Sequence, residues 1–190
     1  MLTERIAQAL ALAVEAHAGQ KRKGTSIPYI SHPLAVASIA LEFGADEDQA
    51  IAALLHDAIE DGGKEYAHII EEQFGDRVLY LVQGCTDGIP DSEGKKTDWY
   101  ERKTNYLLHL EQAHEDILLV SGADKLHNAR AIVFDVKSIG PMVFERFSTK
   151  KEGTLWYYEK LADIFDARSV PMAKPIRDTI NELMKVSFEN

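Results

Sequence analysis

The sequence predicts an all-α fold, a single-domain helical bundle, and three observations support this. Apolar residues recur at the three- and four-residue spacing of a helix along most of the chain. No segment alternates apolar and polar residues in the way that a half-buried strand does. Gly and Pro interrupt the periodic stretches at short intervals, as they do between successive helices. At 190 residues, the chain is long enough to bury a sizeable core within one domain.

The first helices are predicted at residues 2–18, 33–43 and 47–60. The first of them has apolar side chains along one face and stops at Gly19. The second begins at Pro33, whose fixed φ suits the first position of a helix, and stops at Gly44. The third is rich in Ala, Leu and Ile, so we expect it to be buried on several sides before Gly62 ends it.

Further helices are predicted at residues 65–74, 76–84, 98–113, 115–136, 150–167 and 173–187. Gly75 separates the first two of this group, and Pro171 precedes the last. The polar stretch 86–97, which contains Gly and Pro, is predicted to be a loop. We expect residues 1–170 to form the main domain, with 171–190 as a helical extension packed on it.

The composition excludes several classes of protein. The formal net charge is −10, which disfavours sequence-independent binding of nucleic acid because such binding depends on Lys and Arg. No apolar run approaches the roughly 20 residues that cross a bilayer, and the N-terminus lacks the layout of a signal peptide. The single cysteine, Cys85, rules out an internal disulfide and fits a reducing compartment, so we expect a cytoplasmic protein.

Ionisable residues are concentrated in the third predicted helix, in the segment LLHDAIED. His56 and Glu60 are four residues apart, as are Asp57 and Asp61, so each pair shares one side of the helix. Placing these groups in an otherwise apolar helix is costly unless something compensates their charge. A divalent cation is the simplest compensation.

Two more segments supply residues of the same kind. His32 stands in YISHP, and Asp124 stands in ADKLHNAR, four residues before Asn128. Alone, an HD dipeptide or a buried histidine is more often structural than metal-binding. His32, His56, Asp57 and Asp124 together form a mixed nitrogen and oxygen ligand set that suits one ion of manganese, iron or zinc.

These segments resemble a known family. The stretch HAGQKRKGTSIPYISHPLAVA, followed by LLHDAIED, FGDRVLYLVQGCTD and ADKLHNAR, is similar to the hydrolase domain of the RelA/SpoT proteins. The resemblance covers about residues 15–165, and the chain is similar in size to the free-standing small alarmone hydrolases of the HD superfamily. It implies an HD-type helical bundle with a mononuclear metal site.

The resemblance also implies an activity and a set of roles. It implies a manganese-dependent enzyme that removes the 3′-pyrophosphate of guanosine tetra- or pentaphosphate (ppGpp or pppGpp), leaving GDP or GTP. The metal ligands it implies are His32, His56, Asp57 and Asp124. The acidic pair that orients or deprotonates the attacking water corresponds to Glu60 and Asp61, and either can be the proton acceptor. The nucleotide pocket corresponds to Arg22, Lys23 and Asn128.

Some positions depart from the family pattern. Gly62 replaces the usual Thr, and Ala129 and Ala131 replace a large apolar residue and a Thr that can line the base pocket. These departures leave the identity of the substrate's base undetermined. An adenine alarmone, a nucleoside monophosphate or NADPH is therefore an alternative substrate. A non-catalytic nucleotide-binding module is a further alternative, but it has no need of Glu60 and Asp61.

Overall fold

The structure is a computed structural model, and it describes residues 2–88 and 97–188. The N-terminal half consists of α1 (Glu4–Ala16), α2 (Ser31–Glu42), α3 (Glu47–Leu55), a π-helical turn (Ala58–Gly62), α4 (Glu65–Phe74) and α5 (Asp76–Cys85). The C-terminal half consists of α6 (Trp99–Gln112), α7 (Glu115–Ile139), a 3₁₀ helix (Pro141–Arg146), α8 (Lys150–Ala167) and α9 (Ala173–Phe188). Most of the predicted loop 86–97 lies outside the described residues.

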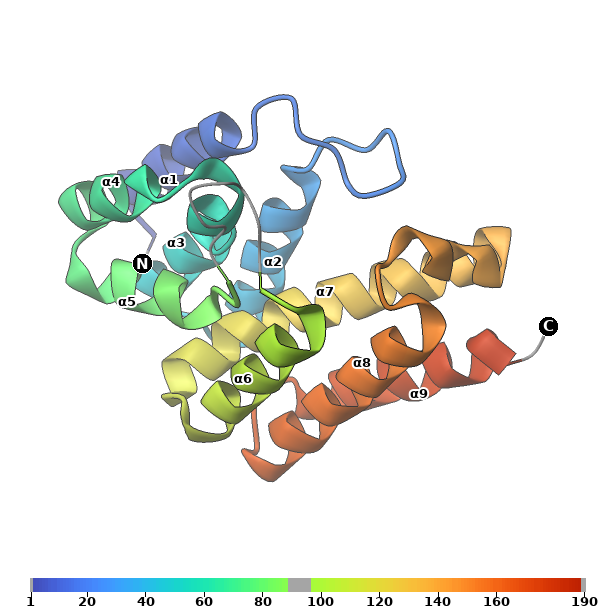
Figure 1. Ribbon diagram of the computed structural model, residues 1–190. Helices are drawn as coiled ribbons and strands as arrows, with labels where there is room; N and C mark the ends of the chain where they lie inside the picture. Colours follow the sequence, from blue (N-terminus) through green and yellow to red (C-terminus); the bar gives the residue numbers. More distant parts are fainter. Residues whose placement is uncertain (1, 89–96, 189–190) are drawn as a thin grey trace.

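The described residues contain one isolated bridge, between Lys21 and Pro28, and otherwise no β-structure. The prediction of an all-α fold is therefore confirmed. Helix α7 runs through the middle of the molecule, with α2, α3 and α5 on one side and α8 and α9 on the other (Figure 1). Its central turns are buried, which places any polar residue on them inside the protein. The C-terminal helix α9 packs along α7 and α8, and the predicted boundary at residue 170 stays a prediction.

Two predicted helix boundaries at the chemistry-bearing segments of the sequence were wrong. Helix α2 begins at Ser31, so Pro33 is its third residue and His32 already belongs to its first turn. The predicted helix 47–60 ends as an α-helix at Leu55, and its last turn widens into the π-helical turn. Such turns are favoured where side chains must be aimed out of helical register, which periodicity does not reveal.

A capping box fixes the start of helix α3. The Asp46 side chain accepts a hydrogen bond from the Gln49 backbone N–H at 2.9 Å, and the Gln49 side chain accepts one from the Asp46 N–H at 2.9 Å. The two bonds satisfy backbone donors that a helix start otherwise leaves unpaired. The helix that leads into His56 and Asp57 therefore has a defined beginning.

Replacing Asp46 with alanine is expected to lower the free energy of unfolding by about 1 kcal/mol, because the cap is lost. Urea denaturation measures this effect. Asp46→Asn is the matched control, since asparagine caps a helix about as well as aspartate but cannot form the ion pair with Arg77, whose Nη2 lies 2.7 Å from Asp46. Equal destabilisation by both substitutions would assign the effect to the ion pair instead.

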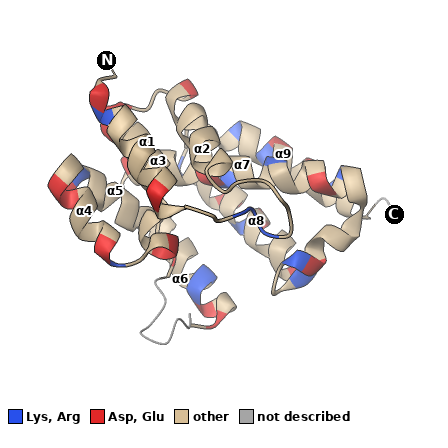
Figure 2. Ribbon diagram, turned by 90° about the horizontal axis from the view of Figure 1, so that it is seen from above, with Lys and Arg blue, Asp and Glu red and all other residues tan. Residues whose placement is uncertain are grey.

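Acidic and basic residues are mixed on the side of the described structure that Figure 2 shows. In Figure 2, acidic and basic segments lie among one another along the helices, and no side of the molecule in that view is predominantly basic. Within the described ranges, none of the helices combines the length and the apolarity that a membrane crossing requires.

Candidate metal centre

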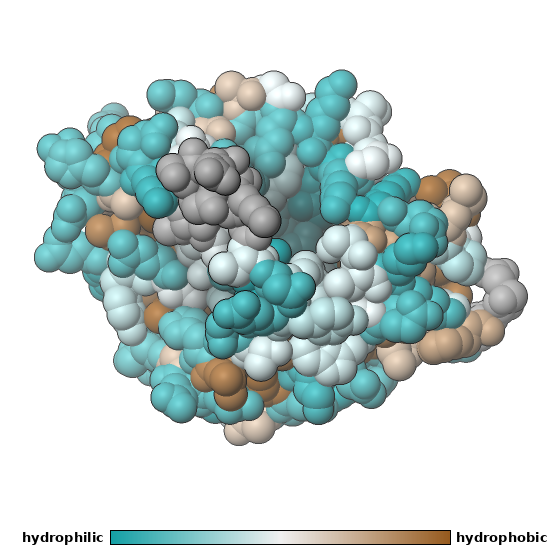
Figure 3. Space-filling model, viewed as in Figure 1, coloured by the Kyte–Doolittle hydropathy of each residue, from teal (hydrophilic) through white to brown (hydrophobic). Residues whose placement is uncertain are grey.

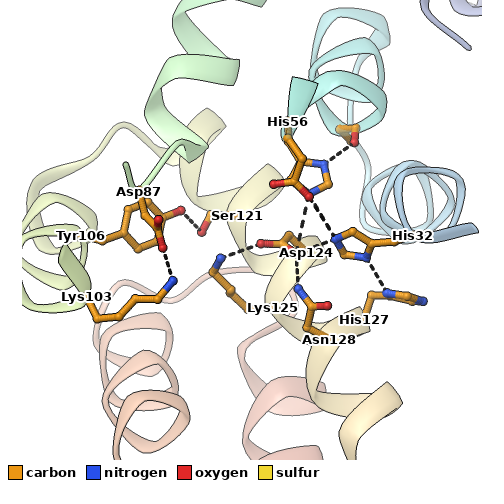
Figure 4. A network of polar contacts seen from close by, with 12 residues as sticks. His32, His56, Asp87, Lys103, Tyr106, Ser121, Asp124, Lys125, His127 and Asn128 are labelled. Atoms are coloured by element: carbon orange, nitrogen blue, oxygen red, sulfur yellow. Dashed lines mark hydrogen bonds and ion pairs between the residues drawn. The ribbon is translucent and has the colours of Figure 1, made fainter. Parts of the chain in front are cut away.

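Four donor atoms from three parts of the chain converge in the interior. His32 comes from the first turn of α2, His56 and Asp57 follow the end of α3, and Asp124 lies in the middle of α7. His32 Nε2 lies 3.2 Å from His56 Nε2 and 3.1 Å from Asp124 Oδ1. Asp57 Oδ2 lies 2.9 Å from His56 Nε2 and 3.6 Å from His32 Nε2. Figure 4 shows the side chains of His32, His56 and Asp124 pointing toward one another.

These spacings fit a shared metal ion. Ligand atoms at about 2.1 Å from a metal are separated by about 3.0 Å in octahedral geometry and about 3.4 Å in tetrahedral geometry. The donor atoms of His32, His56 and Asp124 all lie within 4.8 Å of one another, and all three residues are buried. A buried set of imidazoles and carboxylates indicates a divalent metal site, with Asp57 close enough to join it.

Hydrogen bonds on the far side of each imidazole orient the rings. His56 Nδ1 lies 2.8 Å from the Ala53 carbonyl oxygen, so Nδ1 carries a proton and donates it to that oxygen, while Nε2 faces the centre. His32 Nδ1 lies 2.7 Å from His127 Nδ1. If His32 Nε2 is a ligand, its Nδ1 must donate to His127, which accepts. Sequence reasoning missed this role of His127, although His127 follows Asp124 by three residues on the same helix.

The electrostatics keep the carboxylates ionised. Burial lowers the pKa of His127 to about 4, so its imidazole is neutral and can accept a hydrogen bond. Burial also acts to lower the pKa of His56, but the Asp57 and Asp124 carboxylates outweigh it and raise that pKa to about 9. Burial acts to raise the pKa of Asp124, yet the Lys125 ammonium and the two histidines hold it well below its usual range. Asp124 is therefore an anion, as a ligand must be.

Tyr29 is a second residue in contact with this centre that sequence reasoning missed. Its hydroxyl donates to Asp57 Oδ2 at 2.6 Å. Burial and the charges of Asp57 and Asp61 raise the pKa of Tyr29 far above its usual value, so the hydroxyl stays protonated. The segment YISHP contains both Tyr29 and His32, but nothing in the pattern links Tyr29 to a residue 28 positions away.

Tyr29→Phe is expected to weaken manganese binding by about 10- to 100-fold, the usual effect of removing a group that orients a ligand. Titration of the free-ion electron paramagnetic resonance signal of Mn²⁺ measures the affinity. Tyr80→Phe, at an exposed tyrosine on α5, is the matched control. An unchanged affinity for Tyr29→Phe would show that Asp57 needs no orienting partner.

The acidic pair, Glu60 and Asp61, lies in the π-helical turn that follows His56 and Asp57. Glu60 is half-buried, and Asp61 is exposed. The Asp61 Oδ2 atom accepts a hydrogen bond from Gln20 Nε2 at 2.8 Å, and Gln20 Oε1 lies 2.7 Å from Nδ1 of the buried His17. Gln20, in the loop before α2, therefore links the Asp61 carboxylate to the buried His17.

A pocket of about 480 Å³ opens beside the centre. Arg22, Lys23 and Asn128, the three residues predicted to bind the nucleotide, all line it. Arg22 Nη2 donates to Asn128 Oδ1 at 2.6 Å, and Asn128 Nδ2 donates to Asp124 Oδ1 at 2.6 Å. Asn128 thus joins the pocket wall to Asp124 Oδ1, one of the converging donor atoms. Figure 3 shows a hollow near the middle of the face in view, lined by hydrophilic residues.

The two alanines that depart from the family pattern lie in different places. Ala131 lines the pocket, together with Tyr158 of α8. Ala129 is fully buried in the core and does not line the pocket, so the departure that bears on the pocket wall is Ala131. The reason is geometric: the two residues are separated by about 200° around the helix.

The sequence of this chain matches a known protein family over most of its length. A family model described as HD domain matches residues 9–153, about three quarters of the chain. The chain belongs to the HD domain family.

Curated relatives of this HD domain are much longer proteins. Guanosine-3′,5′-bis(diphosphate) 3′-pyrophosphohydrolase of Aquifex aeolicus is 40% identical over 131 residues, which cover 68% of this chain and 18% of that protein. The bifunctional (p)ppGpp synthase/hydrolase SpoT of Escherichia coli is 36% identical over 133 residues, again 68% and 18%. The chain thus spans less than a fifth of the length of these two relatives. The resemblance to RelA/SpoT proteins that the motifs indicated is confirmed.

Solved structures agree with the fold. A metazoan ortholog of SpoT, described as hydrolysing ppGpp, superposes with a TM-score of 0.75 at 23% identity, covering 97% of this chain and 96% of its own. A protein from Listeria monocytogenes has a TM-score of 0.70 at 26% identity, covering 81% of this chain and 99% of its own. The chain therefore shares its fold with the first structure over 97% of its length and with the second over 81%.

Proposed function

We propose that this HD domain is a manganese-dependent hydrolase that removes the 3′-pyrophosphate of ppGpp and pppGpp, releasing GDP or GTP and pyrophosphate. The observation that supports it most is the convergence of His32, His56, Asp57 and Asp124 beside a pocket lined by Arg22 and Lys23. The curated relatives named as ppGpp 3′-pyrophosphohydrolases support the choice of substrate.

The residues present fit the metal, because the ligand atoms have the spacing of a coordination shell and the carboxylates are ionised. A divalent ion held there supplies a Lewis acid that lowers the pKa of water from about 15.7 toward about 7 and polarises a phosphate oxygen. We propose His32, His56, Asp57 and Asp124 as its ligands.

The chain's own residues carry the remaining steps. A water oxygen bonds to the phosphorus that carries the 3′ oxygen, the bond from phosphorus to that oxygen breaks, and the 3′ oxygen gains a proton. We propose that Asp61 or Glu60 accepts the proton from the attacking water, a role worth about 10²–10⁴-fold in rate. Arg22 and Lys23 bring positive charge to the substrate phosphates, which a protein of net charge −10 otherwise repels.

One observation favours a second substrate class with the same chemistry. Ala131 lines the pocket where the family pattern has a Thr, so the wall offers no hydroxyl at that point to the base. The adenine alarmones and NADPH are therefore the second candidates.

A turnover assay on manganese-loaded protein tests the proposal, with ppGpp, pppGpp, their adenine counterparts and NADPH as substrates. Pyrophosphate released from the guanine alarmones supports the proposed activity. Faster release of pyrophosphate from an adenine alarmone, or release of orthophosphate from NADPH, would assign a different substrate to the same metal-dependent hydrolysis. Binding of manganese without turnover of any of them contradicts the proposal and favours a binding module.

A further inference from the structure

Lys125 is a buried cation next to a proposed metal ligand, and the mechanism above does not use it. Its residue is 9% exposed, and its Nζ lies 2.6 Å from Asp124 Oδ2. A buried ammonium is costly unless an anion pairs with it. Figure 4 shows the Lys125 side chain approaching Asp124 from the side opposite to His32 and His56.

The two oxygens of Asp124 have separate partners. Oδ1 lies 3.1 Å from His32 Nε2 and accepts a hydrogen bond from Asn128 Nδ2 at 2.6 Å, so this oxygen faces the centre. Oδ2 accepts a hydrogen bond from Lys125 and faces away. A carboxylate can bind a metal through one oxygen or both. With Oδ2 engaged by an ammonium, only Oδ1 is available.

The surroundings direct Lys125 to Asp124. Asp87 is the other buried acid of this network, but Arg102 Nη1 lies 2.7 Å from it and Lys103 forms a second ion pair with it. The face of the Tyr106 ring, with its centroid 5.1 Å from Lys125 Nζ, covers another side of the ammonium. In the part of the chain that the structure describes, Asp124 is the anion that directly pairs with Lys125.

We propose that Lys125 is a positioning residue that holds Asp124 to one-oxygen coordination and so keeps a coordination position of the metal open for water or a substrate oxygen. The inference rests on the proposed metal site and is independent of which nucleotide is the substrate. Two neutral imidazoles and two carboxylates cancel the charge of a divalent ion. Lys125 therefore also leaves the loaded centre with a net positive charge.

Lys125→Met tests the proposal, because methionine keeps the length of the side chain and removes the ammonium. Freed from Lys125, Oδ2 is expected to bind the metal as well. The number of exchangeable waters on bound Mn²⁺, measured by water-proton relaxation, is expected to fall. Manganese affinity is expected to change by less than about threefold, while turnover falls by about 10- to 100-fold.

Lys103→Met is the matched control, because it removes a buried ammonium of the same network that pairs with Asp87 instead of a proposed ligand. Its bound-water count is expected to equal that of the unmodified protein. Lys125→Gln provides a second variant that is neutral but polar, in case methionine prevents folding. It is expected to lose the same water.

An unchanged water count in a folded Lys125 variant overturns the proposal. A raised KM with an unchanged count assigns Lys125 to substrate binding instead, and equal loss of affinity and thermal stability in every lysine variant assigns it a purely structural role. Affinity and water count need no substrate. Failure of the nucleotide assay therefore leaves this test intact, and failure of this test leaves the nucleotide assay intact.

Discussion

Replacing Asp61 with asparagine is expected to lower turnover by about 10²–10⁴-fold, because the amide cannot accept the proton of the attacking water. Manganese affinity is expected to change little, since Asp61 is not one of the proposed ligands and its Oδ2 already accepts a hydrogen bond from Gln20. The asparagine Oδ1 can still accept the hydrogen bond from Gln20. Single-turnover rates and Mn²⁺ titrations of the same preparation separate the two quantities. Asp61→Ala is expected to behave in the same way.

Glu60→Gln is the companion variant, because either carboxylate of the pair can be the proton acceptor. The residue whose replacement causes the larger loss of turnover at unchanged metal affinity holds that role. If both variants turn over substrate at the normal rate, neither carboxylate transfers a proton, and the pair only supports the ligands.

Replacing Asp124 with asparagine is expected to abolish metal binding and to destabilise the metal-free protein by about 3–5 kcal/mol. The stability loss follows because Lys125 keeps its charge while its partner, 2.6 Å away, loses its own. Both side chains are close to fully buried, at 11% and 8% exposed, so water does not compensate the loss. Urea denaturation of metal-free protein measures the stability, and a Mn²⁺ titration measures the binding.

The double variant Asp124→Asn with Lys125→Met separates the two effects. Removing both charges is expected to restore most of the stability, since a buried pair replaced by neutral groups is often close to neutral in energy. Metal binding is expected to stay absent, because the ligand is gone. A double variant as unstable as Asp124→Asn would show that the loss comes from packing and not from an unpaired ammonium.

The sequence contained enough to locate the helices and the four proposed ligands, because both depend on local patterns. Apolar spacing marked each helix, and His56 and Asp57 are adjacent in the chain. The contacts that orient the site join distant residues: His32 and His127 are 95 positions apart, and Arg22 and Asn128 are 106 apart. Periodicity within a helix holds no information about such pairs.

Which residues line the pocket or contact Asp124 depends on the direction in which each side chain faces, and the sequence does not give that direction. Ala129 and Ala131 are two residues apart, yet one is in the core and the other lines the pocket. Nothing in the sequence pattern sets Lys125 apart, and its proposed role rests on its burial and on its 2.6 Å contact with Asp124 Oδ2. Family resemblance identified the type of site, while the three-dimensional arrangement distinguished the neighbours that act on it.

The π-helical turn at Ala58–Gly62 has a consequence for how this protein can vary. The turn sets the rotation between the proposed ligands His56 and Asp57 and the acidic pair Glu60 and Asp61. Deleting or inserting one residue there would swing the acidic pair by about 100° around the axis, away from its present direction. Substitutions at Ala58 or Ile59 exchange one packed side chain for another and leave that direction alone. We therefore expect homologous chains with the same chemistry to carry substitutions in this segment but no insertions or deletions.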